Sequence, residues 1–292
     1  MSTPAPPLPF LLVHGAWHGA WCYERVIPLL ARHGHAAVAR DLPAHGINAS
    51  FPASWHRRPL DAAAFGSEPS PCAVTTLDDY ANSVIDSIDS LQAMGHEQVV
   101  LVGHSMGGVA ITAVAERRPE SIAALVYLSA FMPASGVPAV AYIASAENAG
   151  ELVGPQFLAD PAQVGALRMD PRSENADYRA SGKLAFYGDV DTATYDAIAH
   201  LMTPDVPVAP FATPIHITPD RWGAVPRHYI RCLQDRAILP ALQQRFVAEA
   251  DAFVPARPTV VHTLDASHSP FISQPRALAD LLALIAHGNL RA

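Results

Sequence analysis

One serine set between glycines carries the clearest chemical signal in the sequence, within Gly103-His104-Ser105-Met106-Gly107. This G-x-S-x-G pattern follows the apolar run QVVLV and precedes a segment of helical character, the context in which it places a nucleophilic serine on a sharp strand-to-helix turn. Side chains at Gly103 and Gly107 would collide with neighbouring backbone in so tight a turn. We therefore predict Ser105 as a nucleophile, with the Met106 N–H facing the oxyanion that forms during attack.

A second oxyanion donor is expected from the loop after the first apolar run, HGAWHGAW, which begins at His14. A loop of small residues in this place can turn a backbone N–H toward the same oxyanion, and Ala16 is the predicted donor. His14 and His18 also form a metal-like pair, but no third ligand with suitable spacing and no HExxH pattern accompany them. We expect no metal and no other cofactor.

The general base has to be chosen from 14 histidines. A serine hydroxyl is a poor nucleophile until a histidine takes its proton. Where a G-x-S-x-G serine lies between a strand and a helix, the catalytic residues follow one another along the chain as serine, acid and histidine, each on a loop after a strand. His268 follows the last predicted strand and is the predicted base. Asp235 follows the strand RHYIRCL and is the predicted acid, with Asp265 as a competitor that lies very near His268 along the chain.

Strand-length apolar runs alternate with segments of helical period, which predicts an α/β fold with a mostly parallel central sheet flanked by helices. The predicted strands are Pro9–His14, His35–Leu42, Gln98–Val102, Ala123–Ser129, Arg227–Leu233 and Thr259–Leu264. The predicted helices are Glu24–His33, Thr76–Met94, Met106–Arg117, Thr192–Met202 and Pro275–His287.

Two stretches interrupt this alternation. Residues 45–75 are rich in proline, alanine and serine and too long for an ordinary connection, which is typical of a functional or mobile loop. Residues 132–225 hold irregular prolines and short helical pieces, so we expect a cap inserted over the sheet. The predicted core is then formed by residues 1–131 and 226–292.

Aromatic and apolar side chains near the predicted strand ends and in the cap suggest an apolar pocket, hence a hydrophobic or aromatic substrate. The candidate substrate-binding residues are Trp17, Phe131, Met132, Trp222 and Phe271.

Composition excludes several other kinds of protein. The chain has 292 residues, 50% hydrophobic and 16% charged, which suits a large buried core. A net charge of -8 argues against nucleic-acid binding and against anionic membrane surfaces. The only lysine, Lys183, sits in no motif for Schiff-base chemistry. The three cysteines form no CxxC pair and imply no disulfide framework.

The beginning of the chain predicts a cytoplasmic protein. Met1–Pro9 has no basic residue, and the apolar run Phe10–Val13 is too short for a signal-peptide core or a membrane span. The expected partner is a small-molecule ester. A homodimer is compatible with the sequence, which does not specify the oligomeric state.

Together these motifs resemble the α/β-hydrolase superfamily, and more closely its branch of plant methylesterases and hydroxynitrile lyases, with bacterial pyrethroid-hydrolysing esterases also similar. The matching stretches are LLVHGAWHGAWCYERVIPLLARHGHAAVARDL, VVLVGHSMGG, RWGAVPRHYIRCLQDRAILPALQQRF and SHSPFISQP. The resemblance implies an α/β-hydrolase fold, a triad of Ser105, Asp235 and His268, and oxyanion donors at Ala16 and Met106.

The resemblance also separates two activities. In the lyase relatives a threonine follows the first-loop histidine and a lysine follows the catalytic histidine, where this chain has Gly15 and Ser269. Without a cation near the leaving group, hydrolysis of a carboxylic ester is favoured over cyanide release. A cofactor-free oxygenase and a ligand-binding protein without turnover remain as alternatives on this fold.

Overall fold

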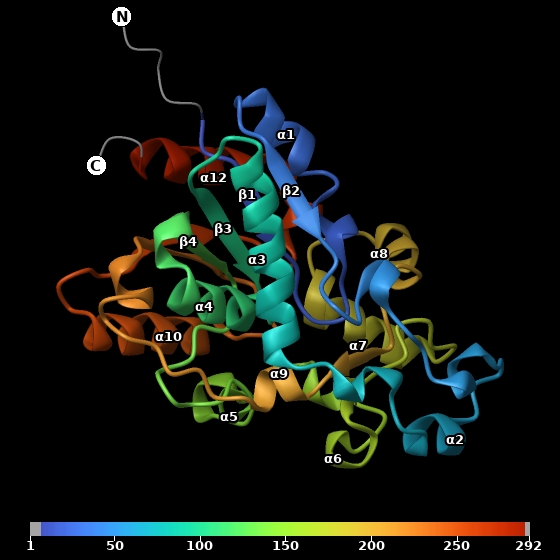
Figure 1. Cartoon of the computed structure of the whole chain (residues 1–292). Helices are drawn as coiled ribbons and strands as arrows, with labels where there is room; N and C mark the ends of the chain where they lie inside the picture. Colours follow the sequence, from blue (N-terminus) through green and yellow to red (C-terminus); the bar gives the residue numbers. More distant parts are fainter. Residues whose placement is uncertain (1–6, 290–292) are drawn as a thin grey trace, which may run out of the picture.

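The central sheet is built from the apolar runs expected to be strands. In this computed structural model, which describes residues 7–289, six parallel strands lie in the order β2-β1-β3-β4-β7-β8 (Figure 1). The strands are β1 Phe10–Val13, β2 Ala37–Arg40, β3 Val99–His104, β4 Ile122–Leu128, β7 Arg227–Cys232 and β8 Val260–Leu264. Residues 1–6, the start of the proline-rich opening, lie outside the described range, as do residues 290–292. The expected parallel α/β sheet is confirmed.

Strand register brings the chemically interesting loops to one edge. Val13 at the end of β1 pairs with Gly103 of β3, and His104 pairs with Leu128 of β4. Leu128 in turn pairs with Ile230 of β7. Because the strands are parallel, the segments that follow them all leave from the same edge of the sheet.

The helices that connect or follow the strands of the N- and C-terminal parts of the chain cover the faces of the sheet. They are α1 Ile27–Arg32, α3 Leu77–Ala93, α4 Gly107–Arg117, α10 Pro240–Phe253 and α12 Pro275–Asn289. The α1 helix packs against α12, and α3 packs against α4 (Figure 1). Helix α3 begins as predicted, because Thr76 and Asp79 form a reciprocal capping box. No helix within residues 7–289 is both long and apolar enough to span a bilayer.

Several predicted elements are shorter than expected, among them the helix predicted over 192–202, which ends at Ala199. The helix expected over 24–33 begins only at Ile27, because Ala20–Tyr23 forms a separate 3-10 turn before it. The strand expected over 35–42 is reduced to Ala37–Arg40. That strand lies at the edge of the sheet, where only β1 pairs with it.

Residues between β4 and β7 gather beyond one end of the sheet (Figure 1). Their helices are α5 Val140–Ile143, α6 Pro161–Val164, α7 Ala176–Tyr187, α8 Thr192–Ala199 and α9 Ala209–Ala212. Two short antiparallel strands, β5 Ala166–Arg168 and β6 Asp205–Pro207, form a second sheet that the sequence pattern did not predict. Three-residue strands leave no readable alternation, which explains why they were missed.

The proline-rich stretch 45–75 is folded and tied to this second sheet. It contains the helix α2 Ala62–Ser67 and several 3-10 turns. The buried Arg168 guanidinium forms a bidentate ion pair with the Asp205 carboxylate, and both nitrogen–oxygen distances are 2.7 Å. Its remaining nitrogen donates to the backbone carbonyls of Phe65 and Glu68, and the Ser70 hydroxyl donates to Asp205.

We expect Arg168→Met to destabilise the protein by about 3–5 kcal/mol, because it leaves the Asp205 carboxylate buried without its partner. Urea unfolding followed by circular dichroism would measure the change. The matched control is Arg245→Met, which removes half-exposed ion pairs with Glu147 and Glu249 and should cost about 1 kcal/mol or less. Equal losses in the two variants would contradict a stabilising role for the buried pair.

Candidate active site

Ser105 occupies the sharp turn that the glycine spacing predicts. It lies between the fully buried strand β3 and helix α4, with a φ of 52° in the left-handed region. A Cβ at Gly103 would lie 2.8 Å from the Gly107 carbonyl oxygen, and one at Gly107 would lie 2.7 Å from that of His14. Both collisions are with backbone, so the turn requires glycine at these positions. The strain at Ser105 is of the kind that concentrates at functional sites.

His268 and Asp235 come together although 33 positions separate them in the chain. The His268 Nδ1 atom lies 2.8 Å from Asp235 Oδ2, and both side chains are buried. Asp265, the alternative acid, instead accepts a hydrogen bond from the Gln234 side chain at the surface. The geometry therefore pairs the imidazole with Asp235.

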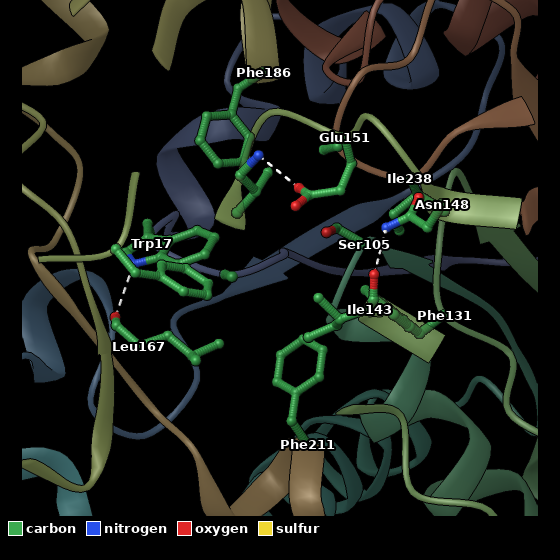
Figure 2. Close-up of a pocket in the computed structure, with 14 residues that line it drawn as sticks. Trp17, Ser105, Phe131, Ile143, Asn148, Glu151, Leu167, Phe186, Phe211 and Ile238 are labelled. Atoms are coloured by element: carbon green, nitrogen blue, oxygen red, sulfur yellow. Dashed lines mark hydrogen bonds between the residues drawn. The ribbon is translucent and has the colours of Figure 1, made fainter. Parts of the chain in front are cut away.

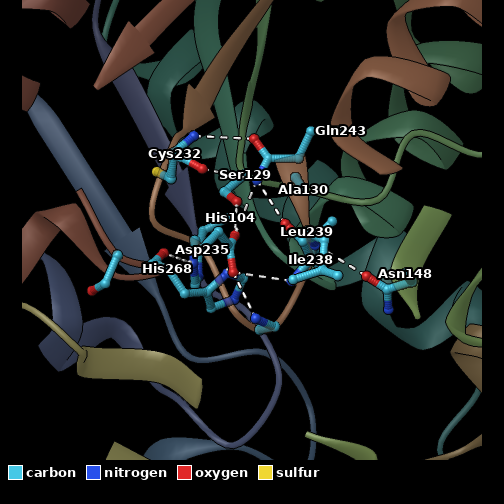
Figure 3. A network of polar contacts seen from close by, with 12 residues as sticks. His104, Ser129, Ala130, Asn148, Cys232, Asp235, Ile238, Leu239, Gln243 and His268 are labelled. Atoms are coloured by element: carbon cyan, nitrogen blue, oxygen red, sulfur yellow. Dashed lines mark hydrogen bonds and ion pairs between the residues drawn. The ribbon is translucent and has the colours of Figure 1, made fainter. Parts of the chain in front are cut away.

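The Asp235 carboxylate is held by a dense set of donors (Figure 3). Its Oδ1 accepts from the backbone N–H groups of Ala237 and Ile238 at 2.7 and 3.0 Å. Its Oδ2 accepts from the Ser129 hydroxyl, from the Gln243 amide at 3.2 Å and from the His268 ring. The carboxylate accepts from His268 Nδ1–H, which leaves Nε2 as the ring nitrogen that can take a proton.

Ser129 and Gln243 were not predicted from the sequence. Ser129 follows β4 with a φ of 40°, and Gln243 lies on α10, where it also accepts from Cys232 N–H at 3.0 Å. A serine after a strand and a glutamine within a helix are common features, so no local signal distinguished them. Only the fold brings both onto the same carboxylate.

The chain segments that carry Ser105 and His268 are in contact through His104. Within residues 7–289 no hydrogen bond joins the Ser105 hydroxyl to the His268 ring. The segments are nevertheless locked side by side, because His104 Nε2 donates to the His268 carbonyl oxygen at 2.9 Å and their rings lie 4.5 Å apart. Catalytic hydrogen bonds are often long or misaligned without substrate and tighten when it binds.

The first loop is shaped around the predicted oxyanion donor Ala16. His14 Nδ1 donates to the Gly15 carbonyl at 2.8 Å, and His18 Nδ1 donates to the Ala16 carbonyl at 2.6 Å. The peptide groups on both sides of Ala16 are thus fixed. Within residues 7–289 neither the Ala16 N–H nor the Met106 N–H donates to a protein acceptor. Both amides are therefore available to an oxyanion.

The two loop histidines, which looked like a metal-binding pair, act as orienting groups. His14 Nε2 accepts from Leu42 N–H at 3.0 Å, and His18 Nε2 accepts from the Tyr187 hydroxyl at 2.5 Å. One nitrogen of each ring donates and the other accepts, which is the pattern of a neutral imidazole.

Burial keeps several histidines of this region uncharged. Loss of solvation lowers the pKa of His18 to about 3 and that of His45 to about 4. The pKa values of His14 and His104 also lie well below the ordinary value, again chiefly because of burial. A neutral imidazole in the folded state must gain a proton when the chain unfolds in acid.

We therefore expect stability to fall steeply on the acid side. Between the ordinary histidine pKa of about 6.5 and the lowered folded values, the unfolded chain binds more protons than the folded one. Each such histidine lowers the free energy of unfolding by about 1.4 kcal/mol per pH unit as the pH falls through this window. Urea unfolding at pH 7.5, 6.0 and 5.0 would measure the slope. A flat profile would contradict burial of neutral histidines.

A narrow apolar cavity opens onto Ser105 (Figure 2). Its walls come from the first loop, the segment after β4, the residues between β4 and β7, and the loop that follows Asp235. The lining residues are Ala16, Trp17, Ser105, Phe131, Ile143, Asn148, Glu151, Val153, Phe157, Leu167, Phe186, Phe211, Ala237 and Ile238.

The structure places two of the five candidate substrate-binding residues in this cavity, Trp17 and Phe131. Trp222 is instead buried and does not line the cavity, and its indole N–H donates to the Tyr127 hydroxyl at 2.9 Å. Phe271 packs edge-on against His104, with ring centres 4.8 Å apart. Met132 is buried in the core and does not line the cavity. Proximity to a strand end did not reveal which way these side chains point.

Comparison with known proteins agrees with this architecture. Residues 10–281 match the alpha/beta hydrolase family, and the chain belongs to that family. It is 30% identical over 291 residues to methylesterase 7 of Arabidopsis thaliana, covering 95% of each chain. It is 28% identical over 275 residues to the pyrethroid hydrolase of Sphingobium wenxiniae, covering 94% of this chain and 85% of the relative.

Solved structures of esterases and hydrolases share the fold of this chain. A pyrethroid hydrolase from Sphingobium faniae superposes with a TM-score of 0.75 at 25% identity, covering 98% of this chain and 99% of the other. Polyneuridine aldehyde esterase superposes with a TM-score of 0.70 at 25% identity, covering 96% and 99%. The α/β-hydrolase fold and the resemblance to its esterase branch are thus confirmed.

Proposed function

We propose that this chain is a carboxylesterase that cleaves hydrophobic or aromatic esters through an acyl-enzyme on Ser105. The observation that carries the proposal is the buried Asp235–His268 pair, 2.8 Å apart, beside a strained serine that faces an apolar cavity. Two of the relatives described above are named methylesterase and pyrethroid hydrolase, which supports the same chemistry.

The proposed cycle has two matching halves. His268 Nε2 takes the proton of Ser105 as its oxygen attacks the ester carbonyl, while the Ala16 and Met106 N–H groups stabilise the oxyanion. The alcohol then leaves with the proton from His268. A water molecule repeats the sequence on the acyl-enzyme and releases the carboxylic acid. Residues 132–225 would act as the cap that supplies much of the pocket wall.

A specific contact disfavours the cyanohydrin-lyase alternative. A Cβ at Gly15 would lie 2.7 Å from Ser105 Cβ and 2.9 Å from His104 Nδ1. The first loop therefore has no room for the threonine that the lyase relatives carry at that place. Ser269, at the position of their lysine, brings no positive charge.

The test is hydrolysis of a panel of methyl, aryl and lactone esters by the wild-type protein and by Ser105→Ala. We expect turnover of at least one apolar ester by the wild type only. Cyanide release from cyanohydrins, or oxygen uptake without added cofactor, would favour the lyase or the oxygenase instead. Binding of esters without turnover by the wild-type protein would contradict the proposal.

A further inference from the structure

The cavity beside Ser105 contains one negative charge. Of the described residues that line it, Glu151 alone is charged. Asn148, another polar lining residue, has both ends of its amide engaged, donating to the Ile143 carbonyl at 3.3 Å and accepting from Leu239 N–H at 3.0 Å. A ligand in the cavity therefore meets apolar walls and one carboxylate.

The loop around Glu151 is built to hold the carboxylate in place. The Val153 N–H donates to Oε2 at 2.6 Å, and the Gly154 N–H donates to Oε1 at 2.9 Å. A Cβ at Gly154 would lie 2.6 Å from Oε1, so glycine permits this close approach. No ion pair within residues 7–289 includes Glu151, whereas the neighbouring Glu147 pairs with Arg245 at 3.0 Å. The charge of Glu151 is thus fixed but not neutralised by a cation.

Aromatic rings line the same cavity. The Trp17 ring lies 5.6 Å from that of Phe186 and 6.2 Å from that of Phe157. Figure 2 shows the Glu151 carboxylate turned inward on the side of the cavity where Phe186 and Trp17 lie. The faces of aromatic rings attract cations, and rings combined with a carboxylate suit alkylammonium groups. The same arrangement repels a second carboxylate.

We propose that Glu151, Trp17 and Phe186 form an ammonium-binding subsite, so that the preferred ester carries a protonated amine on the portion that enters the cavity. This inference deepens the proposed esterase function. The claim that the bound ammonium compound is an ester substrate rests on that function. The binding preference itself requires no turnover, so the two can be tested separately.

The test compares two ligands of similar size and opposite charge, N,N-dimethylbenzylammonium and phenylacetate. Their dissociation constants for the whole protein would be measured by isothermal titration calorimetry at pH 7.5. We expect the ammonium to bind the wild-type protein about 100-fold more tightly than the carboxylate. In Glu151→Gln this ratio should fall by at least about 10-fold.

A matched control separates the pocket from the overall negative charge of the protein. Glu147→Gln makes the same charge change in a nearby residue outside the cavity, and its ratio should equal that of the wild type. Phe186→Leu offers a second test that leaves the Glu151 loop intact, and it should weaken ammonium binding about 3–10-fold more than phenylacetate binding.

Phenylacetate binding as tightly as the ammonium in the wild type would overturn the subsite, and so would a ratio that survives in Glu151→Gln. Ester hydrolysis with no preference for the ammonium ligand would contradict the proposed subsite but support the esterase function. The predicted binding ratio, found together with no hydrolysis of any ester, would contradict the esterase function but support the subsite.

Discussion

Ser105→Ala should lower kcat for ester hydrolysis by on the order of 10⁴–10⁶, because the variant cannot form the acyl-enzyme. What activity remains would come from the oxyanion donors and from binding alone. Steady-state kinetics on the best ester of the panel would measure the loss. The proposed chemistry depends on this hydroxyl more than on any other single group.

The fold should survive this change. The substitution removes one oxygen from a side chain at the cavity wall, so the free energy of unfolding should stay within about 1 kcal/mol of the wild-type value. Unfolding in urea would check this. A folded Ser105→Ala variant that retains near-full esterase activity would exclude Ser105 as the nucleophile.

Asp235→Asn should lower kcat by on the order of 10⁴. An amide at this position can donate to His268 Nδ1, which would move the ring proton to Nε2. The nitrogen that faces the catalytic centre could then no longer accept the proton of Ser105. The same amide would also face the donors of Ala237, Ile238 and Ser129, at a cost in stability of about 1–3 kcal/mol.

Asp265→Asn provides the matched control for this second prediction. It makes the same chemical change three positions before His268, but Asp265 contacts the Gln234 side chain at the surface. Its kcat should remain within about 3-fold of the wild type. If Asp265→Asn proved the more damaging of the two, the pairing of His268 with Asp235 would not operate in catalysis.

The parts of this site predicted from sequence are those with a short-range signal. The glycines around Ser105 are required by close backbone contacts at the turn, so the sequence motif alone indicates the conformation of the turn. His268 and Asp235 were placed by their positions after strands, because parallel strands bring such loops to one edge. The centre of the sheet was recognisable for a related reason, since β1, β3 and β4 contain continuous apolar runs.

The parts that were missed depend on contacts between distant segments. Glu151 is an ordinary loop glutamate in the sequence, and only the packing of its loop turns it into the cavity. Arg168 and Asp205 lie 37 positions apart and pair because β5 and β6 form a small sheet without a sequence signature. Trp222 was expected in the pocket because it is aromatic and lies near a strand, yet it is buried against Tyr127.

The most direct test of the proposed chemistry is covalent labelling with a fluorophosphonate, followed by mass spectrometry of the intact protein and of its peptides. The predicted result is one adduct per chain, located on Ser105, with labelling greatly slowed in Asp235→Asn. A protein that remains unlabelled, or that carries the adduct on a different residue, would contradict the assignment of Ser105 as an activated nucleophile.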